Sequence, residues 1–330
     1  MFTGDCVISI MSKTTIIAQA INADIAGGKT VAQVKSDRAI SDNDWQRYSA
    51  KAYALNLEAE KKKRIADTAK RHVSTTSPEQ VQQIIDLNTR LSPFAIIVPV
   101  TSTMAELNYA LKLAELLPAS EGSLLDLVER AEMQPYFRAL QKIGRFEQFP
   151  YFKVAAKMID AATLSYYRRN YIACYLTLVP VIEGILLRWL GYDGASYQLD
   201  FDKLRRFFQN GYQRQPNPWN IEFHQLFSQA CNELLARHFF RPTTSGSAHD
   251  LFNRHLAVHL LEDEEFATKA NCLRLFMLLD AMTEIYFYET RGDDPRASLH
   301  PSETEADTLL FTSVQTLSAV HSPEDQLLNS

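Results

Sequence analysis

Hydrophobic side chains recur along most of the chain with the period of an α-helix. This period predicts helices at residues 12–25, 79–91, 104–117, 124–143, 167–190, 201–208, 222–238, 250–261 and 270–289, with a break at Pro135. Clusters of glycine, proline and serine separate these segments, as expected for turns between helices. The sequence therefore predicts an all-α protein.

One segment departs from the helical period. Residues 92–101 form a β-branched run between prolines and are the only convincing extended stretch of the chain. A lone strand cannot form a sheet, because its backbone has no neighbouring strand with which to pair. We therefore expect this segment to be a buried connector between helices.

The helices change in character near Phe149, beyond which they become longer and more apolar. After Gly292 the composition shifts to proline, serine, threonine and acidic residues, with one marginal helix at residues 303–320. We therefore expect three parts: a helical N-terminal domain of unknown role at residues 1–145, a helical bundle at residues 146–292, and an acidic, mobile C-terminal tail at residues 293–330.

The longest apolar stretch, residues 171–187, contains Pro180 and Glu183. It is a little short for a membrane span and is apolar almost all round, so we expect a buried core helix and no membrane association. A buried carboxylate needs a partner, because stranding the charge is costly. We expect Glu183 to orient Arg254 or a histidine of a candidate active site. The alternatives are a structural salt bridge and simple exposure.

The net charge is −5, but acids and bases are unevenly distributed. Five of the 39 acidic residues lie within residues 301–330, which contain no lysine or arginine, so residues 1–300 balance at 34 acids and 34 bases. Between Arg138 and Arg214, 12 basic and 6 acidic residues give a local surplus of +6. This surplus would attract phosphate groups if it lay on one face, whereas the alternative is a solvated surface of mixed charge.

The four cysteines, Cys6, Cys174, Cys231 and Cys272, are widely separated and include no Cys-x-x-Cys pair. This spacing is typical neither of a disulfide framework nor of a zinc ribbon. The N-terminus lacks the basic start and the apolar run of a signal peptide. We therefore expect a protein of the reducing cytoplasm.

The candidate chemistry lies at Arg254, His255 and His259, near the start of a predicted helix for which Asp250 and Asn253 are good N-cap types. Arginine offers a permanent charge and a planar fork for phosphate oxygens, and imidazole exchanges protons near neutral pH. Such a set suits RNA cleavage without a metal. A histidine takes the proton of a 2′-hydroxyl, the hydroxyl attacks the adjacent phosphate, and arginine stabilises the charge that develops there.

The motif Arg-His-x-x-x-His at residues 254–259 follows a long helix that carries Glu183, and in this context the chain resembles the higher eukaryotes and prokaryotes nucleotide-binding (HEPN) domain over roughly residues 148–290. That family consists of helical bundles whose nucleases carry Arg-[Asn/Asp/His]-x(3–5)-His and commonly act as dimers. The resemblance implies a metal-independent endoribonuclease that leaves 2′,3′-cyclic phosphate ends, with Arg254, His255 and His259 as the active set.

The resemblance also implies RNA as the substrate, a homodimer, a role as a toxin or antiviral defence effector, and a neutralising or activating protein partner. No cofactor or metal is expected. Glu183 is expected to belong to the catalytic set. Asn253 at the motif, together with Arg205 and Arg206 of the short basic helix, are the candidate substrate-binding residues.

Three other interpretations of the motif remain open. Leu260 stands where many HEPN relatives have glycine, which favours a catalytically inactive module that binds nucleotides, RNA or a protein. His255 and His259 are i and i+4 and could share a zinc ion with Glu262 or Asp263, although no His-Glu-x-x-His motif is present. The motif could also be no more than the capped start of a core helix.

Two basic features of the N-terminal region have weaker functional interpretations. Gly27-Gly28-Lys29-Thr30 resembles the end of a phosphate-binding P-loop, but Ala23 occupies the position of the first glycine and the preceding segment is predicted to be a helix. The run of basic residues at 61–64 lies on a polar helix, which is more typical of a solvated face than of a nucleic-acid patch.

Overall fold

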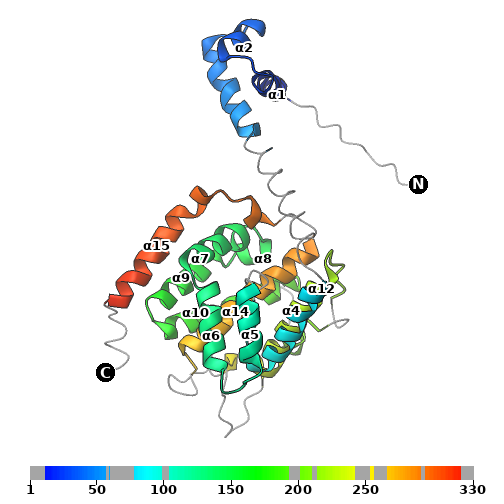
Figure 1. The fold of residues 1–330 in the computed structure, drawn as a ribbon, viewed down its shortest axis with the longest axis vertical. Helices are drawn as coiled ribbons and strands as arrows, with labels where there is room; N and C mark the ends of the chain where they lie inside the picture. The colour runs from blue at the N-terminus through cyan, green and yellow to red at the C-terminus, as the bar shows by residue number, and fades with distance from the viewer. Residues whose placement is uncertain are drawn as a thin grey trace, which may run out of the picture. The chain divides into compact units, whose positions relative to one another are not determined.

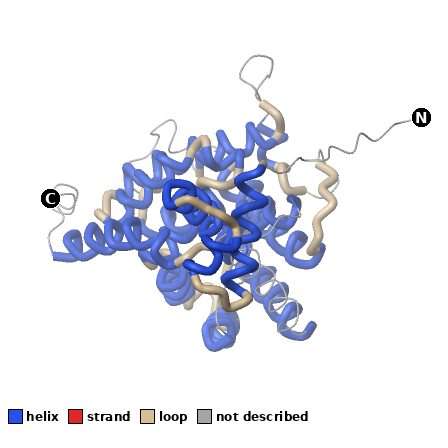
Figure 2. Tube along the Cα trace, turned by 90° about the horizontal axis from the view of Figure 1, so that it is seen from above, coloured by secondary structure: helices blue, strands red, loops and turns tan. Residues whose placement is uncertain are grey.

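The computed structural model describes residues 12–56, 59, 78–98, 104–192, 201–209, 214–241, 253–255, 266–290 and 294–320. The chain divides into two compact units, Met1–His72 and Val73–Ser330, here called unit 1 and unit 2. The residues in these described ranges form helices joined by turns and loops, with no strand (Figure 2). This confirms the predicted all-α class.

Unit 1 contains α1 (Lys13–Ala26), α2 (Val31–Asp37) and a further helix at residues 42–56. Ser12 and Thr30 cap the first two helices, because their side-chain oxygens accept hydrogen bonds from N–H groups that have no partner within the helix. The small core of this unit consists of Ala18, Ile21, Val34 and Ala52.

The central helix of unit 2 is α14 (Lys269–Thr290), which is surrounded by other helices of the unit (Figure 1). Apolar side chains occupy almost every side of α14, so most of its positions are buried. Three long or medium helices pack directly against it: α6 (Glu121–Glu132), α10 (Tyr171–Trp189) and α12 (Ile221–Leu234). The core of unit 2 therefore forms around α14.

The remaining described helices complete this bundle. The α-helices are α4 (Pro78–Leu91), α5 (Met104–Ala114), α7 (Pro135–Gln141), α8 (Pro150–Lys153), α9 (Ala156–Tyr167), α11 (Phe201–Arg205) and α15 (Pro301–Val320). Short 3-10 helices are η1 (Ser92–Phe94) and η4 (Pro295–Ser298), and π-helical turns are η2 (Lys142–Phe146) and η3 (Leu235–Phe239). The predicted break at Pro135 is confirmed, since this proline is the first residue of α7, where its missing N–H has no helical partner to lose.

The expected connector after α4 is confirmed for residues 92–98. It begins as η1 and continues without regular structure, and Ile96, Ile97 and Val98 are all buried. Asn88 compensates for the missing secondary structure, because its side chain accepts a hydrogen bond from the Val98 N–H (2.8 Å) and donates to the Val98 carbonyl (3.2 Å). Residues 99–101 lie outside the described residues.

The boundary between compact units differs from the expected domain boundary at residues 145/146. Helices α4 to α7 contribute Leu87, Leu91 and Leu124 to the same core that contains Ile182 and Phe276. The more apolar helices that begin near residue 149 are the inner helices of this core, and the preceding amphipathic helices cover them. The change in composition near residue 149 therefore reflects how deeply the helices are buried within unit 2 and does not mark a domain boundary.

The expected mobile tail also requires correction for residues 294–320. These residues form η4 and the 20-residue helix α15, which packs against α7 and α9. Phe311 is the main anchor, since it is 2% exposed and its ring centroid lies 5.8 Å from that of Tyr167. Lys142 adds an ion pair to Asp307 at 2.6 Å. One buried aromatic residue thus docks a helix whose other large apolar residues, such as Leu309 and Leu317, are mostly exposed.

Among the described residues, α10 is the one helix whose length and composition would suit a membrane span. It packs against α9 and α14, and its buried residues belong to the core of unit 2. The helix continues through Pro180, which lies on its exposed side. Packing inside the bundle accounts for the apolar character of α10.

Candidate functional site

The structure brings Glu183 and Arg254 together. Arg254 donates hydrogen bonds to both carboxylate oxygens of Glu183, from Nε to Oε2 and from Nη2 to Oε1, the second at 3.3 Å. The two side chains are only 13% and 16% exposed, so this pair is largely screened from solvent. Glu183, the acidic residue of the apolar helix α10, therefore contacts Arg254, the first residue of the motif.

The geometry of this pair leaves part of Arg254 available. A guanidinium has five N–H donors, and Glu183 takes one from Nε and one from Nη2. The two N–H groups of Nη1 and one of Nη2 have no hydrogen-bond partner among the described residues. One N–H of Nη1 and the remaining N–H of Nη2 lie parallel along the free edge of the guanidinium, which is the edge that matches two oxygens of a phosphate.

Asn253 fixes the backbone that carries Arg254. Its Oδ1 accepts a hydrogen bond from the His255 N–H (2.7 Å), and its Nδ2 donates to the Arg241 carbonyl (2.9 Å). With 2% of its surface exposed, Asn253 has a structural position, so the expected role in substrate binding finds no support in its contacts. Tyr175 of α10 is buried beside it; burial raises the pKa of this tyrosine, although the Asn253 backbone opposes the shift.

Phe201 of α11 contacts the other side of the site and was not anticipated from the sequence. The Arg254 guanidinium carbon lies 4.4 Å from the centre of the Phe201 ring, a cation–π contact that fixes the plane of the fork. The sequence signal is an aromatic residue at the start of a basic helix, where Arg205 follows one turn later on the same face.

Arg205 and Arg206 are less available than their sequence suggests. Both hydrogen-bond to Asp202, at 2.7 Å and 3.3 Å, and Arg206 also contacts Gln209. Partial desolvation raises the pKa of Asp202, but the hydrogen bonds from Arg206 and Arg205 outweigh it, and the pKa stays below its usual value. Asp202 is therefore ionised at neutral pH and cancels part of the positive charge beside Arg254.

His255 lies in the described helical turn and is partly buried. His259, Leu260, Glu262 and Asp263 fall outside the described residues, so the structure does not test the second histidine or the zinc interpretation. Within the described ranges, no group of three histidine, cysteine or acidic side chains is placed to hold a metal ion.

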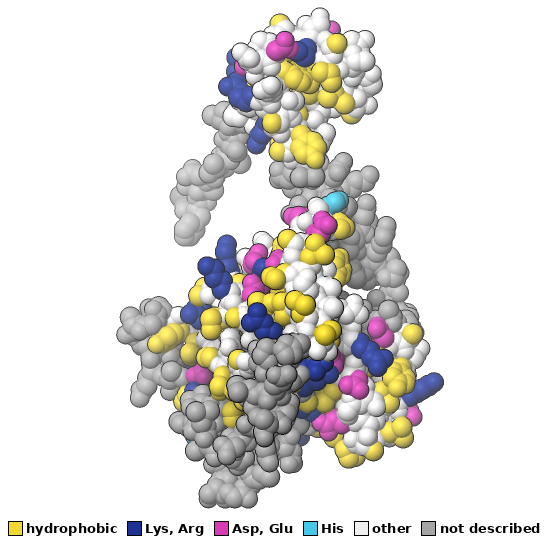
Figure 3. Space-filling view, turned by 90° about the vertical axis from the view of Figure 1, so that its left-hand side faces the viewer, with side chains coloured by type: hydrophobic (Ala, Val, Ile, Leu, Met, Phe, Trp, Pro, Cys, Tyr) yellow, Lys and Arg dark blue, Asp and Glu magenta, His cyan; other side chains and the backbone are white. Residues whose placement is uncertain are grey.

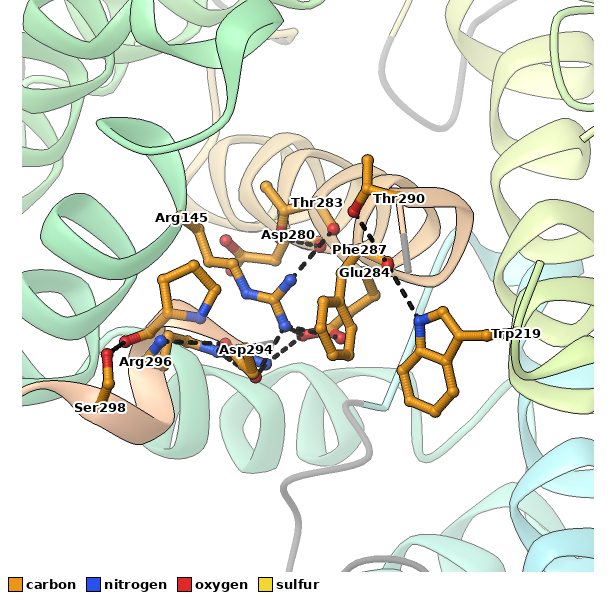
Figure 4. A network of polar contacts seen from close by, with 11 residues as sticks. Arg145, Trp219, Asp280, Thr283, Glu284, Phe287, Thr290, Asp294, Arg296 and Ser298 are labelled. Carbon is orange, nitrogen blue, oxygen red and sulfur yellow. Dashed lines mark hydrogen bonds and ion pairs between the residues drawn. The ribbon is translucent and has the colours of Figure 1, made fainter. Parts of the chain in front are cut away.

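Two of the twelve basic residues between residues 138 and 214 lie buried inside unit 2. Arg138 and Arg145 are 2% and 0% exposed and pair with Asp280 and Glu284 of α14. Figure 4 shows Arg145 reaching this helix beside a third arginine, Arg296. On the face shown in Figure 3, basic and acidic side chains are interspersed. Burial and pairing therefore remove part of the local surplus from the surface, and five of the twelve basic residues are exposed: Lys153, Lys157, Arg168, Arg169 and Arg188.

The second half of this network joins the C-terminal segment to α14. Arg145 and Arg296 both contact Asp294 at 2.9 Å, and Arg296 reaches Glu284 at 2.7 Å. Burial alone would raise the pKa of Asp294, but the positive charges of Arg296 and Arg145 have the larger effect, so its pKa lies below the usual value. The carboxylate therefore stays ionised at neutral pH. Asp280 and Glu284, spaced four residues apart on an apolar helix, are the sequence signal for such a network.

The P-loop resemblance in unit 1 finds no support in the contacts of its lysine. The Lys29 ammonium pairs with Asp37 at 2.9 Å and Asp24 at 3.3 Å, and a helix precedes the glycines. A phosphate-binding lysine needs its charge directed at the ligand. The basic run at residues 61–64 lies outside the described residues.

Comparison of the chain with family models, with curated proteins and with solved structures finds no match.

Proposed function

We propose that this chain is a metal-independent endoribonuclease of the HEPN type. The observation that carries the proposal is the arrangement at Arg254: Glu183 and Phe201 hold its guanidinium in one orientation and leave an edge of N–H donors for a phosphate. His255 follows directly, and the sequence places His259 one turn further along.

In the proposed reaction, a histidine removes the proton of an RNA 2′-hydroxyl, and the oxygen attacks the adjacent phosphorus. Arg254 stabilises the negative charge on the non-bridging oxygens, because its outer edge can donate two parallel hydrogen bonds. A second histidine protonates the leaving 5′-oxygen, and the products end in a 2′,3′-cyclic phosphate and a 5′-hydroxyl. We infer that a second copy of the chain supplies one of the two histidines.

Glu183 has a positioning role in this proposal. Its carboxylate selects one rotamer of a long side chain, so less conformational entropy is lost when Arg254 meets the phosphate. The same pairing favours a second candidate function, a catalytically inactive RNA-binding module, because Glu183 already neutralises much of the arginine charge. Leu260, at the position where many HEPN relatives have glycine, points in the same direction.

The test is cleavage of an end-labelled single-stranded RNA in EDTA, with identification of the product ends. We expect cleavage by the unaltered chain, cyclic phosphate ends, and no cleavage of a DNA strand of the same sequence. Arg254→Ala and His259→Ala should each lower the rate by about 10²-fold or more.

Two matched variants control for the loss of charge and of imidazole. Arg237→Ala removes an arginine whose side chain is 63% exposed and pairs with Glu233, and His300→Ala removes an exposed histidine. Both should cleave at the rate of the unaltered chain. RNA binding without cleavage would select the inactive module, and cleavage that requires a divalent metal would contradict the proposed chemistry.

A further inference from the structure

A cavity of about 580 Å³ opens in unit 2 between three segments of the chain. The turn after α11 forms one wall, the loop at residues 214–218 forms the second, and one face of α12 forms the third. Small-molecule sites commonly have volumes of roughly 300–1,000 Å³. The cavity therefore has room for a ligand of several fused or linked rings.

The wall formed by α12 is a stripe of uncharged polar side chains, Gln225, Ser228, Gln229 and Asn232. Their spacing of i, i+3, i+4 and i+7 places them on one side of the helix, while Phe227 and other apolar residues face the core. None of the four makes a side-chain hydrogen bond within the described part of the chain. The buried Oδ1 of Asn232 in particular has no partner there.

The buried Oδ1 of Asn232 favours a ligand that can donate a hydrogen bond to it, since a buried acceptor without a donor is destabilising, while the exposed amides of Gln225 and Gln229 can exchange water for a ligand. Amide side chains offer a donor and an acceptor side by side. Such pairs match the edge of a heterocyclic ring, as in the pairing of asparagine or glutamine with a nucleobase.

Arg214 supplies the charge of the cavity. Its guanidinium carbon lies 4.6 Å from the ring centre of Trp189 and 4.5 Å from that of Phe207, and it pairs with Glu289 of α14. His224 contacts the same carboxylate at 2.9 Å. Among the described residues that line the cavity there is no carboxylate, whereas Arg214 and His224 are present. Both already contact Glu289, so an anionic group would be a second partner for an ion-paired guanidinium.

The loop wall is held in place before any ligand arrives. Trp219 donates from its backbone N–H to the Tyr288 carbonyl (3.1 Å) and from Nε1 to the Phe287 carbonyl (3.2 Å), as Figure 4 shows for the indole. Pro216 and Pro218 restrict the backbone just before this attachment. A wall that is already ordered loses little conformational entropy on binding.

We propose that this cavity binds a nucleoside monophosphate, whose planar ring hydrogen-bonds to the amide stripe of α12 and whose phosphate meets Arg214. The proposal rests on residues distinct from the Arg254 site and does not depend on RNA cleavage. The same chemistry is offered by a free nucleotide and by a terminal nucleotide of an RNA strand, and the experiment separates these sources.

The test is isothermal titration of the full chain with each of the four ribonucleoside monophosphates, and with a short RNA carrying the preferred nucleotide at its end. Adenosine serves as a ligand that lacks the phosphate, and ribose 5-phosphate serves as a ligand that lacks the base. We expect at least one monophosphate to bind, and its base-free and phosphate-free fragments to bind about tenfold or more weakly. Tighter binding of the RNA than of the monophosphate would assign the cavity to a strand end, and equal or weaker binding to the free nucleotide.

Two variants in the cavity and one control variant test the location. Ser228→Phe places a ring inside the cavity and should abolish binding, while Ser313→Phe places the same ring at an exposed position of α15 and should leave binding unchanged. Gln229→Glu keeps the size of an exposed side chain and adds a negative charge, so the monophosphate should bind about tenfold more weakly, and its loss of affinity should exceed that of adenosine, which carries no phosphate. The proposal would be overturned if none of the four monophosphates bound at millimolar concentration. It would also be overturned if neither Ser228→Phe nor Gln229→Glu weakened binding.

Discussion

Seven ionisable side chains, five of them buried and two partly buried, cluster at the middle of α14, and their charges do not balance. The four acids are Glu132, Asp280, Glu284 and Asp294, and the three bases are Arg138, Arg145 and Arg296. Fully ionised, the group carries a net charge of 3 − 4 = −1. A buried uncompensated charge is costly, so one acid should hold a proton at neutral pH.

We infer that Glu132 is the acid that holds this proton. Its Oε2 is buried without a hydrogen-bond donor among the described residues, whereas Asp280 accepts hydrogen bonds from Arg138. Burial, together with the negative charge of Asp280, raises the pKa of Glu132 well above its usual range. The Oε1 of Gln141 also lacks a donor, and both side chains line a cavity of about 20 Å³, room for about one water molecule. A protonated Glu132 provides the donor that this pair of oxygens lacks.

We therefore predict that Glu132→Gln stabilises unit 2 increasingly as the pH rises. In the unfolded chain this glutamate ionises near 4.5, while the folded state keeps the proton to higher pH. Between those two pKa values the unfolded state binds fewer protons, so folding loses about 1.4 kcal/mol of stability per pH unit. Glutamine mimics the protonated acid and does not titrate. The two proteins should thus converge below pH 4.5 and diverge above it.

The assay is urea unfolding at a series of pH values, followed by the fluorescence of Trp189 and Trp219, which both lie in unit 2. Glu129→Gln is the matched control on the same helix, because Glu129 pairs with Lys269 at 2.7 Å and accepts from the Tyr166 hydroxyl. The control should cost a small amount of stability that does not grow above pH 5. A Glu132→Gln variant that is less stable at pH 8, or whose difference from the unaltered protein is constant with pH, would refute the charge argument.

Two further changes probe packing and the candidate site. Phe311→Ala should destabilise the docking of α15 by about 3–5 kcal/mol, whereas Leu309→Ala, at a residue that is 60% exposed, should change stability by less than about 0.5 kcal/mol; urea unfolding measures both. Glu183→Gln removes the charge that orients Arg254, so we expect RNA cleavage to fall by about tenfold or more through kcat, with less than about 2 kcal/mol lost in stability. Unchanged kcat in a folded variant would show that Glu183 has no positioning role.

The local features of the fold could be predicted from the sequence. The helical period, the break at Pro135 and the buried connector after residue 91 depend on residues within a few positions of one another. The order of hydrophobic and polar side chains contains that information directly. The same reasoning anticipated that α10 would be buried, because no side of it is polar enough to face water.

The division of the chain into units could not be predicted in the same way. Helices α4 to α7 are amphipathic, and an amphipathic helix can cover a separate core or the core of a neighbouring bundle equally well. The choice depends on contacts between distant residues. The docking of α15 depends similarly on Phe311, whose binding surface is supplied by residues more than a hundred positions earlier. The adjacent Leu309 and Leu310 are equally apolar but exposed, so local sequence does not single out the residue that docks.

Buried charge shows how far such reasoning extends. Burial of Glu183 required a partner, and the sequence offered Arg254 because a motif had already drawn attention to it. Asp280 and Glu284 carry the same signal, yet Arg138 of α7 and Arg145 of η2 lie more than a hundred positions earlier, and only Arg296 of η4 is near in the sequence. A carboxylate in an apolar helix therefore predicts that a cation lies nearby without identifying it. Where several basic residues compete for such partners, as between residues 138 and 214, their number alone overstates the positive charge that remains for RNA.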